Sequence, residues 1–106
     1  MTSASPFGEN LRRLSGLYEL NVGELAHILG LSRQAVSSLL SGKSQPSTPT
    51  LLKVEEIFSV DSRIMTDSFS ELLPDQDTYL EVEDRISRLR TERWAKIFRL
   101  PDNPRP

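Results

Sequence analysis

Hydrophobic side chains recur along this sequence at intervals of three and four residues, the spacing of one face of an α-helix, and no stretch alternates as a β-strand does. The pattern predicts five helices within the first 73 residues. A longer helical stretch without Gly or Pro follows them. The predicted helices cover residues 7–18, 22–29, 33–41, 49–58, 61–73 and 75–100. We therefore expect an all-α fold in which a five-helix domain precedes a long C-terminal helix.

Residues with special backbone preferences stand where these helices should begin and end. Gly30 and Gly42 follow the second and third hydrophobic faces, and each suits the left-handed conformation that often closes a helix. Ser32 can accept a hydrogen bond from a free backbone N–H and so cap the third helix. Thr48 followed by Pro49 predicts a capping residue and a first helical residue for the fourth helix.

Charge is unevenly distributed, although the net charge is only −2. Residues 1–60 carry five basic and five acidic side chains, residues 61–84 carry one basic and eight acidic, and residues 85–99 carry six basic and one acidic. The acidity therefore lies downstream of the first helices. The absence of a strong basic stripe in residues 1–60 counts against tight nucleic-acid binding by a monomer.

Several classes of function lack the residues that they need. There is no Cys, which excludes disulfides and thiolate metal sites. We expect the single His, His27, to face outward without binding a metal. No nucleophile stands beside a base and no Gly-rich phosphate loop is present, so we expect neither an enzyme nor a cofactor. The sequence shows neither a secretory signal nor an apolar run long enough for a membrane span, so we expect a cytoplasmic protein.

The stretch from Asn21 to Gly42 has the residues that two short, steeply crossing helices require. Ala26 is small enough for the point where the helices touch, and Gly30 permits the sharp turn that follows. Val36 is placed to pack the second of these helices onto the first. Ser32 would begin that second helix with its N-terminus directed outward.

These residues resemble the helix-turn-helix of the Cro/C1-type (XRE) family of bacterial and phage repressors. The resemblance lies in Glu24–Ser37, Ser41–Lys43, Pro46–Ser47 and Leu51–Lys53, and it extends over residues 7–73. It implies a domain that binds double-stranded DNA with its third helix in the major groove and regulates transcription as a repressor.

The resemblance also implies which side chains touch DNA. Arg can donate two hydrogen bonds to guanine, Gln can pair with adenine, and a Ser hydroxyl can donate or accept. The loop after the third helix resembles the phosphate-contacting loop of the family, and an Arg of the first helix can add a phosphate contact from the flank. The predicted base-reading residues are Ser32, Arg33, Gln34, Ser37 and Ser38, and the predicted phosphate contacts are Ser41, Lys43, Ser44, Arg12 and Arg13.

Two positions depart from the family pattern. Val22 stands where the family often has a Gln that touches a phosphate, so we expect that contact to be absent. Glu19 stands where a Gly commonly ends the first helix, so we expect that turn to be shaped differently.

The long C-terminal helix, residues 75–100, carries a narrow apolar seam that it cannot bury alone. The seam must pack either on residues 7–73 or on a second copy, and the order of acidic then basic residues suits an antiparallel pair of such helices. Residues 1–6 and 101–106 should form a flexible arm and a loose tail. The predicted dimerisation residues are Tyr79, Val82, Ile86, Leu89, Trp94 and Ile97.

Two functions follow from these observations. The first is a sequence-specific transcriptional regulator that binds operator half-sites as a homodimer. The alternative is an antitoxin or phage control factor whose C-terminal helix binds a second protein.

Overall fold

The structure, a computed structural model, describes residues 6–61, 63, 65 and 73–98, with side chains described up to Arg93. All the elements in this part of the chain are helices, which confirms the expected all-α fold. The described helices are α1 (Pro6–Leu17), α2 (Val22–Leu29), α3 (Arg33–Ser41), α4 (Thr48–Phe58) and α5 (Gln76–Phe98). The helix predicted over residues 61–73 falls largely outside the described residues.

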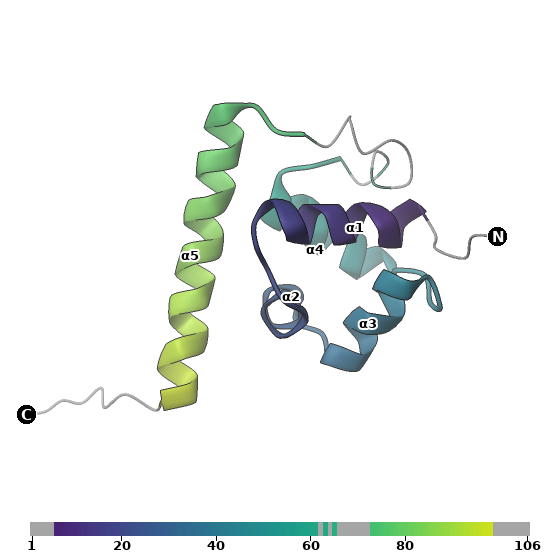
Figure 1. Ribbon diagram of the computed structural model, residues 1–106, viewed down its shortest axis with the longest axis horizontal. Coiled ribbons are helices and arrows are strands. Elements are labelled where there is room, and N and C mark those ends of the chain that lie inside the picture. The colour runs from purple at the N-terminus through teal and green to yellow at the C-terminus, as the bar shows by residue number, and fades with distance from the viewer. Residues whose placement is uncertain (1–5, 62, 64, 66–72, 99–106) are drawn as a thin grey trace, which may run out of the picture.

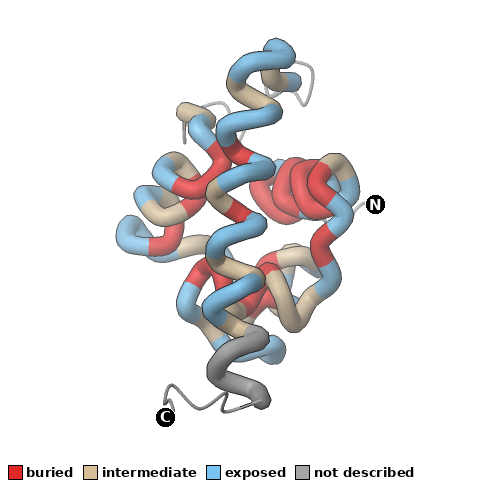
Figure 2. The backbone as a smooth tube through the Cα atoms, turned by 90° about the vertical axis from the view of Figure 1, so that its left-hand side faces the viewer, coloured by how far each residue is buried: buried red, intermediate tan, exposed pale blue. Residues whose placement is uncertain are grey.

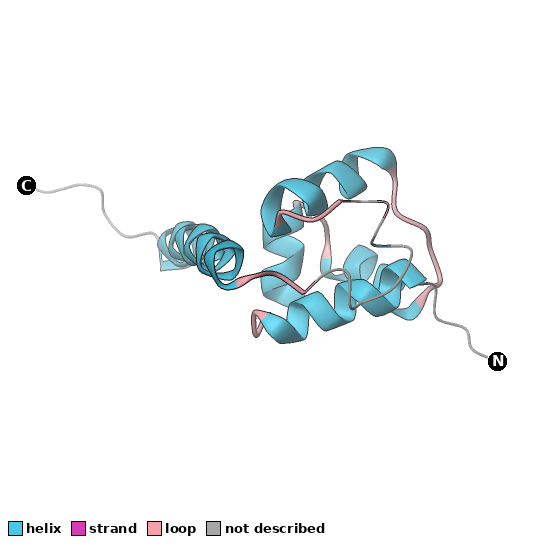
Figure 3. Ribbon diagram, turned by 90° about the horizontal axis from the view of Figure 1, so that it is seen from above, coloured by secondary structure: helices cyan, strands magenta, loops and turns pink. Residues whose placement is uncertain are grey.

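The first four helices pack together, and α5 runs along one side of them (Figure 1). Seen from above, α5 lies nearly end-on beside the other four (Figure 3). Helix α3 packs on α1 and α2, whereas α5 packs on α2 and α4. No helix in the described ranges is long and apolar enough to cross a membrane.

Helices α2 and α3 have the caps that local sequence predicts. Gly30 and Gly42 adopt left-handed φ values of 71° and 83° at the ends of the two helices. The Ser32 hydroxyl accepts a hydrogen bond from the Ala35 N–H at 3.0 Å. Helix α4 begins one residue earlier than predicted, because Ser47 is the capping residue and Thr48 is already helical.

The turn after α1 corrects one expectation. Glu19 adopts φ 55°, the left-handed conformation that a Gly would take there, so the turn is not reshaped by the missing Gly. Backbone hydrogen bonds from Glu19 N–H to Gly16 O and from Leu20 N–H to Ser15 O close it. A side chain in this conformation costs about 1–2 kcal/mol.

The core contains side chains from all five described helices, and Figure 2 shows buried positions on α5 as well as on the four-helix domain. Met65, from the predicted fifth helix, is fully buried, and its carbonyl accepts a hydrogen bond from Asn10 Nδ2. The largest fully buried side chains are Phe7, Phe58, Leu11, Leu14, Leu25, Met65, Ile86, Val36, Val54 and Val82.

The apolar seam of α5 is covered within the chain. Val82 and Ile86 are 0% and 2% exposed, and Tyr79 and Leu89 pack partly buried against the same core. Of the two arrangements that the sequence leaves open, the structure therefore has the seam on the chain's own domain. Association of two copies stays a prediction, and in this conformation it would need a surface other than the seam.

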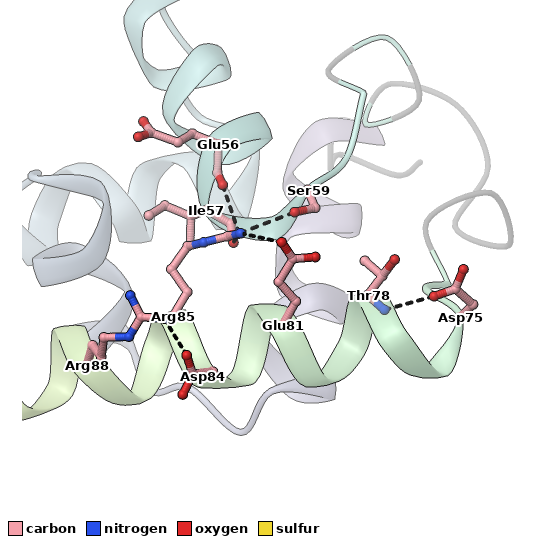
Figure 4. Close-up of polar contacts among 9 residues, drawn as sticks. All are labelled: Glu56, Ile57, Ser59, Asp75, Thr78, Glu81, Asp84, Arg85 and Arg88. Atoms are coloured by element: carbon pink, nitrogen blue, oxygen red, sulfur yellow. Dashed lines mark hydrogen bonds and ion pairs between the residues drawn. The ribbon is translucent and has the colours of Figure 1, made fainter.

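Polar contacts at the edges of the seam hold α5 in place. Arg85 donates to the carbonyls of Glu56 and Ile57 and to the Ser59 hydroxyl at 2.7–3.2 Å, so it binds the C-terminal end of α4 (Figure 4). Asp75 accepts a hydrogen bond from the Thr78 N–H at the start of α5, which holds the pKa of its carboxyl below the usual range. Helix α5 therefore meets the other helices through the polar contacts of Arg85 as well as through its apolar seam.

Candidate nucleic-acid interface

Helices α2 and α3 form the crossing that the sequence predicts. Ala26 and Val36 are buried at 5% and 0% exposure where the two helices pack. Between them the Gly30 turn is closed by a hydrogen bond from the Leu31 N–H to the Ala26 carbonyl at 2.9 Å. Because Val36 and Leu39 anchor α3 on one side, its polar residues face the other way.

The outward face of α3 is polar and hollowed. Gln34, Ser37 and Ser41 are exposed, and Ser38 is half-buried. Together with Lys43 they line an open hollow of about 320 Å³. Five residues that the sequence assigns to base or phosphate contacts are therefore neighbours on one surface.

The other two predicted base-reading residues lie differently. Ser32 is exposed, and its hydroxyl oxygen already accepts the capping hydrogen bond, so its proton and one lone pair are left for a base. The Arg33 guanidinium lies outside the hollow, over Gly23 in the first turn of α2.

The residues predicted to contact phosphate after α3 lie in an exposed, hydrogen-bonded loop. Lys43 and Ser44 are exposed, and their backbone N–H groups both donate to the Ser38 carbonyl, at 2.9 and 3.3 Å. The Ser41 hydroxyl donates to the same carbonyl at 3.3 Å. These hydrogen bonds hold the loop in one conformation while the Lys43 side chain faces outward.

Arg12 and Arg13 already have contacts within the chain. Arg12 donates to the Leu40 carbonyl at 3.0 Å, which links α1 to the end of α3. Arg13 lies 3.4 Å from Glu9 one turn away. A guanidinium has five N–H donors, so neither contact prevents a further one to phosphate.

Three features in and around α2 could not be predicted from the sequence. Arg90 of α5 pairs with Glu24 at 3.1 Å and donates to the Glu19 carbonyl. Arg93 reaches the same turn of α2 as Arg33 does. His27, expected to face outward, is half-buried instead, and its Nε2 is enclosed without a hydrogen-bond partner in the part that the structure describes. It follows Gly23 and Glu24 by one turn, on the face that α5 covers.

The predicted dimerisation residues whose side chains are described do not form a free surface. Val82 and Ile86 are buried and Tyr79 and Leu89 half-buried within the chain, as described above. The side chains of Trp94 and Ile97 lie outside the described ones.

Two crossing helices joined by a short turn, with an exposed polar face on the second, define a helix-turn-helix protein. Residues 9–64, more than half of the chain, match the family model described as helix-turn-helix. The chain therefore belongs to the Cro/C1-type helix-turn-helix family that its residues resemble.

Two archaeal proteins extend the comparison. A Pyrococcus furiosus protein, whose name describes it as an HTH-type transcriptional regulatory protein, is 33% identical over 104 residues, which cover 91% of this chain and 33% of that protein. A Thermoplasma acidophilum protein with the same kind of name is 35% identical over 79 residues, which cover 74% of this chain and 24% of that protein. No solved structure matches the chain.

Coverage differs between the chain and these relatives. The chain spans about a third or less of the length of each. Since 91% of this chain is matched in the Pyrococcus protein, the similarity extends beyond residue 64 into α5. Helix α5 is therefore part of what the two chains share.

Proposed function

We propose that this chain binds double-stranded DNA in a sequence-specific manner and regulates transcription, with α3 in the major groove. The observation that carries the proposal is the polar hollow on the outward face of α3, lined by Gln34, Ser37, Ser38, Ser41 and Lys43. A major groove about 12 Å wide admits one helix, and its base edges present the donors and acceptors that such side chains pair with.

The hollow places different chemistry at its two ends. Gln34, in the first turn of α3, can pair through its amide with adenine, and the Ser37 and Ser38 hydroxyls can donate or accept. Lys43, beyond the end of α3, can neutralise a phosphate without reading sequence. This order, with base contacts on the helix and phosphate contacts after it, suits a helix that lies in a groove between two backbones.

The names of the two archaeal relatives support regulation of transcription as the outcome of binding. An operator that is occupied by protein is closed to other proteins, so we propose repression as the mode of regulation.

We propose further that two copies act together. One α3 covers only a few base pairs, and residues 1–60 carry no net charge, so a single copy has little affinity to draw on. Two copies on half-sites about 34 Å apart would double both the base contacts and the phosphate contacts.

Selection of bound sequences from a pool of random duplexes tests the proposal. The chain should enrich one sequence and bind it at least about a thousandfold more tightly than a scrambled duplex of the same composition. A variant with Gln34→Ala and Ser37→Ala should lose most of that preference while its thermal unfolding midpoint stays unchanged, because both side chains are exposed. If the chain enriches no sequence and binds no duplex, the proposal is wrong.

A further inference from the structure

Arg93 is a charged residue on the apolar face of α5. Val82, Ile86, Leu89 and Arg93 follow one another at intervals of four, three and four residues, so they share one face of the helix. Val82 and Ile86 on that face are buried against the four-helix domain. Arg93 is therefore directed toward α2, beside which the C-terminal half of α5 lies (Figure 1).

Two guanidinium groups meet over Gly23. A Cβ atom placed on Gly23 would lie 2.9 Å from Arg33 Nη2 and 3.2 Å from Arg93 Nη2. The two nitrogens are consequently no more than about 6 Å apart, although one belongs to α3 and the other to α5. The missing side chain of Gly23 leaves the space in which both groups lie.

No described carboxylate neutralises this pair of charges. Glu24, the acidic residue next to Gly23, is directed to other partners: Oε1 accepts from the Asn21 N–H at 3.0 Å, Oε2 accepts from Arg90 Nε at 3.1 Å, and neither oxygen lies within ion-pair distance of Arg33 or Arg93. Among the residues with described side chains, no ion pair or hydrogen bond includes Arg33 or Arg93. Two positive charges at this separation repel each other and favour an anion between them.

We propose that Arg33 and Arg93 together bind one backbone phosphate of the DNA, so that α5 is part of the DNA interface. The proposal rests on the proposed function, since it names a further contact with the same ligand. Charge-assisted N–H···O bonds of about 2.8 Å, made to two oxygens of one phosphate, can bridge the gap between the two groups. Arg33 then positions α3 instead of reading a base, and α5 supplies a phosphate contact beside Val22, whose side chain cannot make one.

The experiment measures affinity of the full chain for its selected duplex and for a scrambled duplex over a range of salt concentrations. Arg93→Gln should weaken binding to both duplexes by roughly tenfold, because a phosphate contact carries no sequence information. The double variant Arg33→Gln with Arg93→Gln should lower the slope of log K against log salt by about one unit. Arg93→Lys keeps the charge and should recover most of the affinity.

Two controls separate a local contact from general attraction. Arg88→Gln removes the same charge from an exposed position on α5, where Arg88 pairs with Asp84, and should change affinity much less. Gly23→Ala removes no charge but displaces Arg33, so it should weaken binding to both duplexes. The thermal unfolding midpoint of each variant confirms that the fold is kept.

Three results would overturn the inference. Equal losses of affinity from Arg93→Gln and Arg88→Gln would mean that only the overall positive charge of α5 attracts the DNA. A loss confined to the selected duplex would mean that the pair reads a base, and no loss would mean that α5 stays clear of DNA. In each of these cases the parent chain still binds its duplex and the proposed function stands, whereas a parent chain that binds no duplex removes both.

Discussion

At the scale of single residues, one side of α3 packs against the domain and the other side is exposed. Val36 and Leu39 are buried and pack the helix onto the domain, whereas Gln34 and Ser37, one turn apart, are exposed to solvent. Changes on the outward side should therefore alter binding without altering stability. This separation makes the outward residues good probes of recognition.

Replacing Gln34 with Ala should cost about 1–3 kcal/mol of binding to the selected duplex and relax the preference at one base position. The amide of Gln34, which lines the hollow, can donate to and accept from one adenine at the same time. Affinity for every single-base variant of the duplex gives the measurement. Gln76→Ala, an identical change at the exposed first residue of α5, is the control and should have no effect. Unchanged selectivity in the Gln34 variant would contradict base reading.

Replacing Lys43 with Ala should weaken binding equally for selected and scrambled duplexes. A lysine on phosphate contributes charge but no sequence information, so its loss should reduce the salt slope by about one unit. Lys53→Ala on α4 removes the same charge outside the hollow and should change the slope less. A shift in base preference at constant slope would assign Lys43 to a base instead.

Residues whose role depends on their nearest neighbours could be predicted from the sequence. Gly30, Gly42 and Ser32 have the predicted conformations or hydrogen bonds, since turns and caps are decided within about four residues. The Arg33 orientation could not be predicted, because the space over Gly23 is shared with Arg93, 60 positions along the chain.

At the scale of elements, the turn between α2 and α3 tests the helix-turn-helix directly. Gly30→Ala should destabilise the chain by about 1–2 kcal/mol, because the backbone there has φ 71° and an added Cβ meets no atom that could compensate. Gly16→Ala in α1 is the matched control: its surroundings are equally open, its backbone is helical, and it should stabilise by about 0.5–1 kcal/mol. Denaturant unfolding measures both changes. The same sign in both variants would contradict the left-handed turn.

The contact between Tyr18, in the turn after α1, and Tyr79 of α5 should make stability depend on alkaline pH. Tyr18 stacks on Tyr79 with ring centroids 5.1 Å apart. Burial raises the pKa of the Tyr18 hydroxyl from 10.0 to about 12. The nearby Tyr79 and Glu83 raise this pKa further by smaller amounts, and Arg85 lowers it. The folded chain then keeps a proton that the unfolded chain releases between these pH values, so the free energy of unfolding falls as pH rises from about 10 to about 12.

Tyr18→Phe keeps the stacked ring and removes the titrating hydroxyl. The variant should lose less stability than the parent chain between about pH 10 and about pH 12, and should show the parent's pH dependence at neutral pH. Urea unfolding at a series of pH values measures this difference. An equally steep alkaline loss in the variant would show that other groups cause it.

The sequence predicted the existence of α5 and its seam but left open what the seam covers. Helical spacing identifies Val82 and Ile86 as one face, yet the same face would suit a second copy or the chain's own domain. The choice depends on α2 and α4, which present a complementary apolar surface and the carbonyls that Arg85 binds. The spacing of apolar residues within α5 does not reveal the shape of a surface that is formed by other helices.

At the scale of the whole molecule, the covered seam changes what a dimer can be. With Val82 and Ile86 inside one chain, two copies in this conformation must meet on another surface. Two copies that exchange α5 would instead keep the same contacts between chains, since exchange of an identical element preserves its interface. Both forms place two α3 helices in one assembly. In the first form α5 packs on its own chain, and in the second it packs on the partner chain.

A substitution at Ile86 distinguishes an α5 that covers its own domain from an α5 that joins two copies. Ile86 is 2% exposed, so Ile86→Asp should bury a charge, remove apolar packing and cost about 3 kcal/mol or more. Leu80→Asp makes the same kind of change on the outer face of α5, where Leu80 is 54% exposed, and should change stability by less than about 0.5 kcal/mol. Thermal unfolding should therefore show a large fall in midpoint for Ile86→Asp alone, at every protein concentration. Sedimentation at the same concentrations gives the number of copies. If Ile86→Asp instead keeps its midpoint in dilute solution and only loses a dimer, the seam joins two copies and α5 does not cover its own domain.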